Sequence, residues 1–194
     1  MVKNTVIAEL QARGGFIRAN EVKSRREYEQ LRRAVEGGEL LRIRNGVYAD
    51  LSALANNMID IECIVPGGVL CLYSAFVHYG LSTQVPSAFC VAIEAKRKLC
   101  LPNYPVIELY YWKKTNLEFG ILQKNLSGYT VRITDLERTV CDAVKYRNKI
   151  GLDVCGEVID NYLKKENRNI SLLHEYAGKL RLKKILTRYL ETRL

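Results

Sequence analysis

Hydrophobic and polar positions over the first twenty-three residues predict short helices around an extended stretch. Apolar side chains at helical spacing predict a helix over residues 5–12, which two consecutive glycines end. Residues 16–18 follow as a short extended stretch. Asn20 is suited to cap a brief second helix over residues 21–23, because Asn side chains accept hydrogen bonds from the first helical amides.

A longer helix begins at a capping box formed by Ser24 and Glu27. In this motif each side chain accepts a hydrogen bond from the other residue's backbone amide. The helix is predicted to extend to about residue 35 and to end at two further glycines. The face that we expect to pack inward carries Tyr28, Leu31 and Val35.

The opposite face of this helix carries Arg26, Gln30 and Arg33, with Arg25 and Arg32 on its flanks. Arginine bonds guanine in a bidentate manner, and glutamine bonds adenine in the same way. An outward face of this composition, after a short helix and a tight turn, suits entry into the major groove of DNA. The alternative interpretation is a charged helix face that is merely solvated.

Residues 39–49 predict a hairpin of two short strands around Asn45 and Gly46. This dipeptide favours a type I′ turn, in which both central residues have positive φ. We expect Leu41, Ile43 and Val47 to face the core. Arg42 and Arg44 would then point outward, where a wing contacts phosphates or the minor groove. Three helices and a basic hairpin, in this order, predict a winged helix-turn-helix with DNA contacts at Arg25, Arg26, Gln30, Arg33, Arg42, Arg44 and Asn45.

The remainder of the chain predicts a larger domain. A buried helix over residues 69–79, ending at Gly80, is followed by strands over 88–94, 106–112, 117–124 and 129–133. A second capping box, Thr134 with Glu137, begins a series of helices that includes 153–164, 171–179 and 180–192. The expected fold class is α+β: a winged helix-turn-helix over residues 1–50, then a mixed α/β domain over 58–194 with a mainly antiparallel sheet and C-terminal helices.

Charge adds a functional hint. The 194 residues have a formal net charge of +9, which favours polyanionic partners. Residues 1–60 hold ten basic and eight acidic side chains, a balance of +2, so the rest of the chain holds +7. The positive charge is therefore not confined to the predicted DNA-binding domain.

Several classes of protein are disfavoured by what the sequence lacks. No apolar run approaches the roughly 20 residues that span a bilayer, and the first residues do not resemble a signal peptide. The six cysteines include no C-x-x-C pair, so we expect reduced, structural thiols and no metal site. Phosphate-binding and dinucleotide-binding glycine motifs are absent. We therefore expect a cytoplasmic protein that binds no membrane, no metal and no cofactor.

One element leaves an enzymatic alternative open. Glu94 and Lys96, at the end of a predicted strand, have the E-x-K spacing of metal-dependent nucleases. That chemistry needs a second acidic ligand on the preceding strand, and residues 67–89 contain no Asp or Glu. A solvated strand end is the competing interpretation, so the favoured reading is a protein without catalytic residues.

Three stretches resemble the AbiEi-type antitoxins and regulators of type IV toxin–antitoxin, or abortive-infection, systems. Residues 40–48 are similar to the family's basic hairpin ending in G-V-Y, and residues 72–81 to its S-A-x-x-x-x-G-L helix. Residues 133–142 are similar to its T-x-x-E-R-T-x-x-D helix start. The stretches occur in the family's order and extend over most of the chain.

The resemblance implies a winged-helix autorepressor that binds double-stranded operator DNA with inverted repeats. It also implies a C-terminal antitoxin domain, functionally linked to a nucleotidyltransferase-like toxin without a stable complex, in defence against phage. A winged-helix regulator with no toxin partner is the alternative within the same fold.

Two groups in the C-terminal half are candidates for an antitoxin surface or for contacts to the DNA backbone. Arg138 and Asp142 are four residues apart and can pair along a helix, so a structural clasp between sheet and helix is their alternative role. The other group consists of basic residues of the last helix, namely Lys183, Lys184 and Arg188. The alternative role of this group is a solubilising surface.

Overall fold

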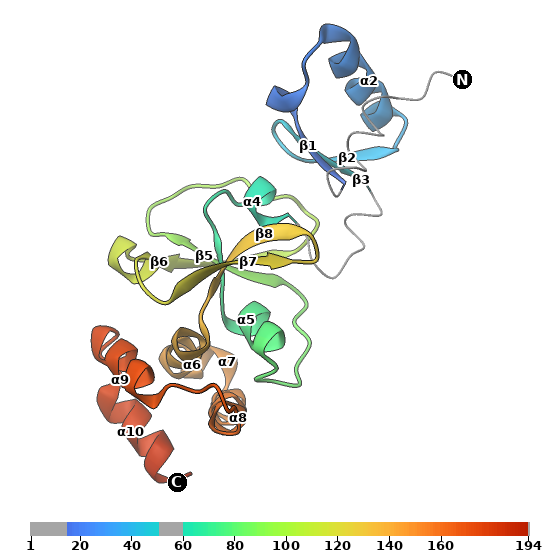
Figure 1. Cartoon of the computed structure of the whole chain (residues 1–194). Coiled ribbons are helices and arrows are strands. Elements are labelled where there is room, and N and C mark those ends of the chain that lie inside the picture. Colours follow the sequence, from blue (N-terminus) through green and yellow to red (C-terminus); the bar gives the residue numbers. More distant parts are fainter. Residues whose placement is uncertain (1–14, 51–59, 194) are drawn as a thin grey trace. The chain divides into compact units, whose positions relative to one another are not determined.

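The computed structural model describes residues 15–50 and 60–193, and it has the expected α+β class (Figure 1). The helix predicted over residues 5–12 and the bridge after residue 50 lie outside the described residues. Two compact units are present. The first unit holds the described residues up to Gly68, together with Lys98–Ile107 and Lys124–Val131. The second holds Val69–Arg97, Glu108–Gln123 and the chain from Arg132 onward. The predicted domain limits, 1–50 and 58–194, stay a prediction.

The first unit contains a three-stranded antiparallel sheet and one long helix. Its elements are β1 (Phe16–Arg18), η1 (Ala19–Glu21), α2 (Arg25–Glu36), β2 (Leu40–Arg44), β3 (Val47–Asp50) and α4 (Ile61–Ile64). The strand order is β1-β3-β2, with Phe16 opposite Ala49 and Arg42 opposite Tyr48. Strand, short helix, long helix and hairpin thus follow one another as predicted over residues 16–50.

A small core holds these elements together. Ile17, Leu31, Ala34 and Leu40 are buried, so β1, α2 and β2 share one apolar interior. The short helix differs from the prediction in its range and in its cap, since it spans residues 19–21 and not 21–23. Asn20 lies within η1, and the backbone amide of Arg18 instead donates to the Glu21 carboxylate at 3.1 Å.

A five-stranded sheet has the order β6-β5-β4-β8-β7. Its strands are β4 (Val69–Leu70), β5 (Phe89–Glu94), β6 (Ile107–Trp112), β7 (Ile121–Leu126) and β8 (Tyr129–Thr134). The central strand β4 pairs antiparallel with β5 and parallel with β8. The prediction of one helix over residues 69–79 is therefore wrong at its start, since only α5 (Leu72–Tyr79) is helical. A continuous apolar run does not distinguish a buried strand from a buried helix.

The helices after β8 agree closely with the predicted ranges. They are α6 (Leu136–Lys145), α7 (Arg147–Ile150), α8 (Leu152–Leu163), α9 (Ile170–Lys179) and α10 (Lys183–Glu191). The four-residue helix α7 was not predicted. Gly80 ends α5 in the left-handed conformation with φ 60°, as expected for a C-terminal glycine. The strand predicted over 117–124 begins later, because η2 (Lys114–Leu117) precedes β7.

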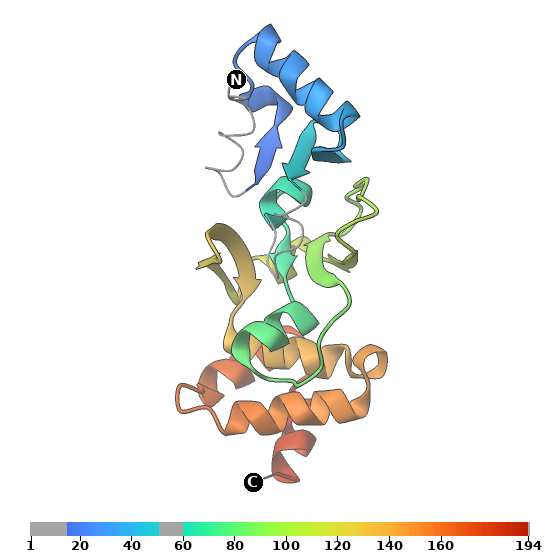
Figure 2. The same ribbon diagram turned by 90° about the vertical axis from the view of Figure 1, so that its right-hand side faces the viewer.

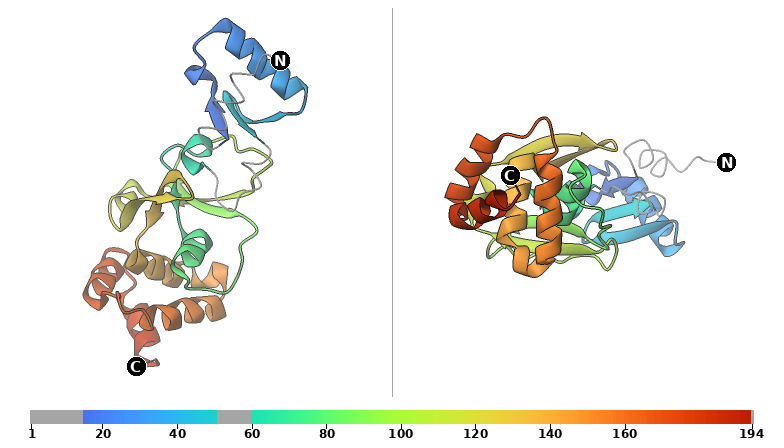
Figure 3. Two further views of the ribbon diagram at one scale, coloured as in Figure 1. Left: turned by 45° about the vertical axis from the view of Figure 1, so that its right-hand side comes forward. Right: turned by 90° about the horizontal axis from the view of Figure 1, so that it is seen from below.

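The main core of the second unit lies between one face of the sheet and the helices α5, α6, α8, α9 and α10 (Figures 2 and 3). Cys90, Ala92, Tyr110 and Trp112 alternate along β5 and β6 and pack into this core. From α10, Leu182, Leu186 and Leu190 are buried, as their helical spacing predicts. In the part of the chain that the structure describes, no helix is both long and apolar enough to cross a bilayer.

Candidate nucleic-acid interface

Helix α2 begins at the capping box that the sequence predicts. The backbone amide of Glu27 donates to Ser24 Oγ at 3.2 Å, and the backbone amide of Ser24 donates to Glu27 Oε2 at 3.2 Å. The amide of Lys23 also donates to Glu27 Oε2, at 2.8 Å. Because these side-chain contacts satisfy amides that the first turn leaves unpaired, the start of α2 is fixed by local sequence.

The buried side of α2 is rotated from the predicted one. Leu31 and Ala34 are buried, and Val35 packs against them. Tyr28, expected inside, is 49% exposed, so that part of the prediction is wrong. Gln30, expected outside, is half-buried, and its Oε1 is enclosed without a hydrogen-bond partner among the described residues. Leu31 and Ala34 determine the rotation of α2 about its axis, because these two side chains contact the apolar interior and Tyr28 does not.

Exposed arginines of α2 fall into two groups that differ in charge compensation. Arg25 pairs with Glu29 at 3.6 Å, and Arg32 pairs with Glu36 at 2.8 Å. Arg26 and Arg33 are exposed and form no ion pair with any residue that the structure describes. Arg32, which the sequence interpretation placed on a flank, is exposed and held in an ion pair with Glu36. Its i, i+4 spacing to Glu36 is the signal that would have identified this pair.

The hairpin after α2 places Arg42 and Asn45 at its exposed end. Arg42 Nη2 donates a hydrogen bond to Asn45 Oδ1. Gly46 has φ 72°, whereas Asn45 is not among the residues with positive φ, so the predicted type I′ turn is wrong. Arg44 lies opposite Val47 at the end of β2.

An irregularity in β2 explains a second difference from the prediction. The pairing register shifts between Arg42 and Arg44, so strict alternation of inward and outward side chains is interrupted. Ile43 and Val47 are buried as predicted, but Leu41 is 40% exposed and Leu40 occupies the core instead. The shift leaves Arg42 on the exposed side.

Arg138 and Asp142, the first C-terminal candidates, lie in the interior of the second unit. Both side chains are 0% exposed, so their assignment to a surface is wrong. Arg138 Nε donates to both carboxylate oxygens of Asp142 at 3.1 Å. Arg138 Nη1 donates to the carbonyl oxygens of Asn116 at 2.9 Å and Phe119 at 3.2 Å. The pair thus joins α6 to the segment before β7, which is the clasp role that the sequence left open.

Aromatic rings enclose the buried guanidinium. Its central carbon lies 4.5 Å from the Trp112 ring centroid and 4.4 Å from that of Phe119. Both distances allow cation–π attraction, which is stronger where water is excluded. Burial raises the pKa of Asp142 to about 6, although the adjacent Arg138 acts in the opposite direction. The Asp142 carboxyl is the acidic group that faces the Arg138 guanidinium in this interior.

The start of α6 is capped by Asp135 and not by Thr134, contrary to the predicted capping box. Asp135 Oδ1 accepts from the Arg138 amide at 2.7 Å, and Asp135 Oδ2 accepts from the Tyr176 hydroxyl at 2.9 Å. Glu137 is turned elsewhere and accepts from the Asn169 amide at 2.8 Å. The polar residues that resemble the family's motif therefore make internal contacts to α9 and to the loop that precedes it.

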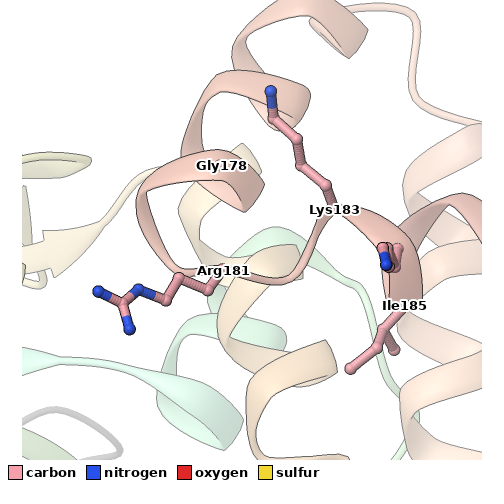
Figure 4. A pocket seen from close by; sticks show the side chains of 5 residues that line it. Gly178, Arg181, Lys183 and Ile185 are labelled. Atoms are coloured by element: carbon pink, nitrogen blue, oxygen red, sulfur yellow. The ribbon is translucent and has the colours of Figure 1, made fainter.

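The basic residues of α10 are exposed, as their pattern predicts. Lys183, Lys184 and Arg188 are exposed and, among the described residues, take part in no ion pair. A hollow of about 700 Å³ lies beside the turn from α9 to α10, lined in part by Arg181, Lys183 and Lys184. Figure 4 shows the Arg181 and Lys183 side chains pointing away from one another. The arrangement is a broad basic surface and not a convergent anion site.

Glu94 and Lys96 do not gather further acidic residues around them. Glu94 ends β5 with its side chain exposed, and Lys96 follows in a turn with φ 74°. Over residues 15–50 and 60–193, no group of three His, Cys, Asp or Glu side chains has the geometry to hold a metal ion. No observation therefore favours the nuclease alternative.

No protein-family model matches the chain, and comparison with curated proteins finds no similar sequence. The likeness to AbiEi-type antitoxins rests on the three sequence stretches alone.

Proposed function

We propose that this chain is a sequence-specific DNA-binding repressor that acts as the antitoxin of a type IV toxin–antitoxin system, without enzymatic activity. DNA binding and the antitoxin role have different support. The first rests on the exposed chemistry of residues 16–50. The second rests on the resemblance to AbiEi-type antitoxins.

The observation that supports DNA binding best is the exposed basic face of α2 next to an antiparallel hairpin. Arg25, Arg26, Arg32 and Arg33 are all exposed on a helix of twelve residues. The strand order β1-β3-β2, with α2 preceding the hairpin, agrees with the element order of winged helix-turn-helix domains. The wing would contribute Arg42, and the net charge of +9 favours association with a polyanion.

Selection from a pool of random-sequence duplex DNA tests this function. We expect the full chain to enrich one sequence and to bind it about 10³-fold or more tightly than unselected duplex. The same protein incubated with DNA or RNA and Mg²⁺ should leave both intact. If no duplex sequence is enriched over the others, the sequence-specific role is excluded. Cleavage of the DNA or RNA would support the nuclease alternative.

The antitoxin role has a separate test. Co-expression with a nucleotidyltransferase-like protein encoded beside this gene should restore growth that the toxin alone suppresses. If no such gene adjoins it, or if growth is not restored, the alternative of a winged-helix regulator without a toxin partner stands.

A prediction concerns the wing. Replacing Arg42 with glutamine should lower the slope of log K against log salt concentration by about 0.9, because one phosphate contact is lost. The enriched sequence should stay nearly the same. Arg42→Lys, which keeps the charge, is the control and should preserve the slope. An unchanged slope in Arg42→Gln would place the hairpin outside the interface.

A second prediction concerns the basic surface of α10. Because Lys183 and Lys184 are exposed and unpaired among the described residues, the double variant Lys183→Glu/Lys184→Glu should fold normally. If this surface contacts the DNA backbone, the variant binds the selected duplex with a salt slope lower by about two units. Equal affinity, equal slope and full protection against the toxin would leave these lysines as a solubilising surface only.

A further inference from the structure

We infer that a hollow formed by α8, α9 and α10 binds a small organic anion with an apolar body. Helix α10 packs against both α8 and α9 at the end of the second unit (Figure 1). The hollow beside these helices has a volume of about 620 Å³. Small-molecule sites typically measure roughly 300–1,000 Å³, so the hollow has the size of such a site. The inference does not rest on the proposed DNA-binding function.

Apolar side chains from all three helices line part of the hollow. Leu163 ends α8, Ile170 begins α9, and Leu190 lies near the end of α10. Leu190 is buried and Leu163 is half-buried, whereas Ile170 is 37% exposed. A ligand that covers Ile170 removes this apolar surface from water, which favours binding. These three residues therefore favour a ligand whose body is apolar.

Two arginines give the same hollow its positive character. Arg168, in the loop between α8 and α9, is exposed, and its Nη1 donates to the Lys165 carbonyl oxygen at 2.9 Å. Its Nη2 has no hydrogen-bond partner among the described residues. Arg193, which follows α10, is the second arginine. Of the described residues that line the hollow, Glu191 alone is acidic, so positive charge predominates there.

Arg193 is held in place by several contacts. Its Nε donates to Asp160 Oδ1 at 2.5 Å, and its Nη1 donates to the Tyr189 carbonyl oxygen at 3.3 Å. The guanidinium carbon also lies 5.5 Å from the centroid of the Tyr189 ring. Asp160 compensates part of this charge, so Arg168 supplies most of the attraction for an anion. A guanidinium that is already fixed binds an anion at a smaller entropic cost than a mobile one.

Gly156, in the middle of α8, makes room for this guanidinium. Glycine inside a helix is unfavourable relative to alanine, so its presence there calls for a physical reason. A Cβ atom at Gly156 would lie 2.8 Å from Arg193 Nη2. Arg193 therefore occupies space that the side chain of another residue would fill. Gly156 does not line the hollow itself, so it acts on the site by positioning Arg193.

The dye anilinonaphthalene sulfonate is a suitable probe, because it joins an aromatic body to one sulfonate group. Its fluorescence rises at apolar sites, so titration of the full chain measures Kd. Phenylnaphthylamine, the same body without the sulfonate, measures the contribution of the anionic group. We expect saturable binding of the dye, about 10-fold or more tighter than that of the neutral analogue. Inorganic sulfate at the concentration of the dye should not displace it, because sulfate lacks the apolar body.

Two substitutions with matched controls locate the probe. Arg168→Gln should weaken dye binding about 10-fold and leave the neutral analogue unaffected. Its control is Lys184→Gln, since Lys184 is an exposed cation of α10 that does not line this hollow. Ile170→Ser should weaken both ligands about 3-fold or more. Its control is Leu152→Ser, because Leu152 is also the first residue of its helix, is 62% exposed and lies outside the hollow.

Gly156→Ala tests the placement of Arg193 without a direct contact to the ligand. The atom that the new Cβ meets is the end of a flexible side chain, so the helix should accept alanine. Thermal unfolding should therefore occur at the same or a higher temperature. The affinity for the dye should nevertheless fall about 3-fold or more, because Arg193 is displaced. Unchanged affinity would overturn the part assigned to Arg193.

The inference as a whole is overturned if the dye does not saturate, if the neutral analogue binds as tightly as the dye, or if sulfate displaces it. It is equally overturned if Arg168→Gln and Ile170→Ser bind the dye as their controls do, because the dye then lies elsewhere on the chain. None of these results depends on the selection of a DNA sequence. Failure of this site and failure of the proposed function are therefore distinguishable.

Discussion

Replacing Arg138 with methionine should lower the free energy of unfolding by about 3–5 kcal/mol, the cost of removing one partner of a buried ion pair. Methionine approximates the aliphatic stem of arginine but cannot neutralise Asp142, which is 0% exposed. The carbonyl oxygens of Asn116 and Phe119 would also lose their shared donor. Urea-induced unfolding of the full chain measures the change.

A double-mutant cycle separates the pair from the packing around it. Asp142→Asn should also destabilise the protein, and the double variant Arg138→Met/Asp142→Asn should be less destabilised than the sum of the single variants. Lys179→Met is the control, since Lys179 and Glu175 form an exposed pair with the same i, i+4 spacing at 2.7 Å. Its effect should stay within about 1 kcal/mol. If Arg138→Met unfolds with the same free energy as this control, the buried pair does not hold α6 to the segment before β7.

This pair illustrates what the sequence predicts and what it does not. The spacing of Arg138 and Asp142 on one helix is a local property, and their pairing follows from it. Their burial is not local, because it depends on Trp112 of β6 and on Phe119 of the segment before β7, both more than fifteen residues earlier in the chain. A surface role and an internal role are therefore equally compatible with the sequence pattern.

The candidate interface shows the same difference between features that depend on local sequence and features that depend on distant residues. The capping box at Ser24 fixes where α2 begins, because both of its partners lie within three residues. The rotation of α2 depends on which side chains meet β1 and β2, and there Ala34 takes the place that size and hydrophobicity predicted for Tyr28. The identity of the exposed arginines was thus predictable, whereas the rotation of the helix about its axis was not.

In the hairpin, the register shift between Arg42 and Arg44 is a local irregularity that simple alternation does not predict. Alternation along a strand predicts Leu41 inside, but one irregular residue reverses the sides of its neighbours. Val69 and Leu70, in contrast, become a strand only because β5 and β8 lie on either side of them, and these partners are distant in sequence.

Gly120 should be the least replaceable glycine beside this buried pair. Its φ is 63°, and a Cβ atom there would lie 2.7 Å from Arg138 Cβ and 3.1 Å from Tyr176 Cε2. Gly120→Ala therefore combines backbone strain of about 1–2 kcal/mol with overpacking of about 1–3 kcal/mol. Its carbonyl oxygen also accepts from the Asp135 amide at 2.9 Å, so a shift of this backbone would disturb the cap of α6. We expect a loss of about 3 kcal/mol in the free energy of unfolding.

Gly128→Ala is the matched control for this substitution. Gly128 also has a left-handed backbone, with φ 88°, but nothing lies within 4 Å of the Cβ that alanine would add. Its cost should be the strain alone, about 1–2 kcal/mol. The difference between the two variants in urea-induced unfolding then measures how closely the segment before β7 is pressed against Arg138. Equal losses would show that the close approach relaxes at no cost, and that Arg138 holds this segment by its hydrogen bonds and not by packing.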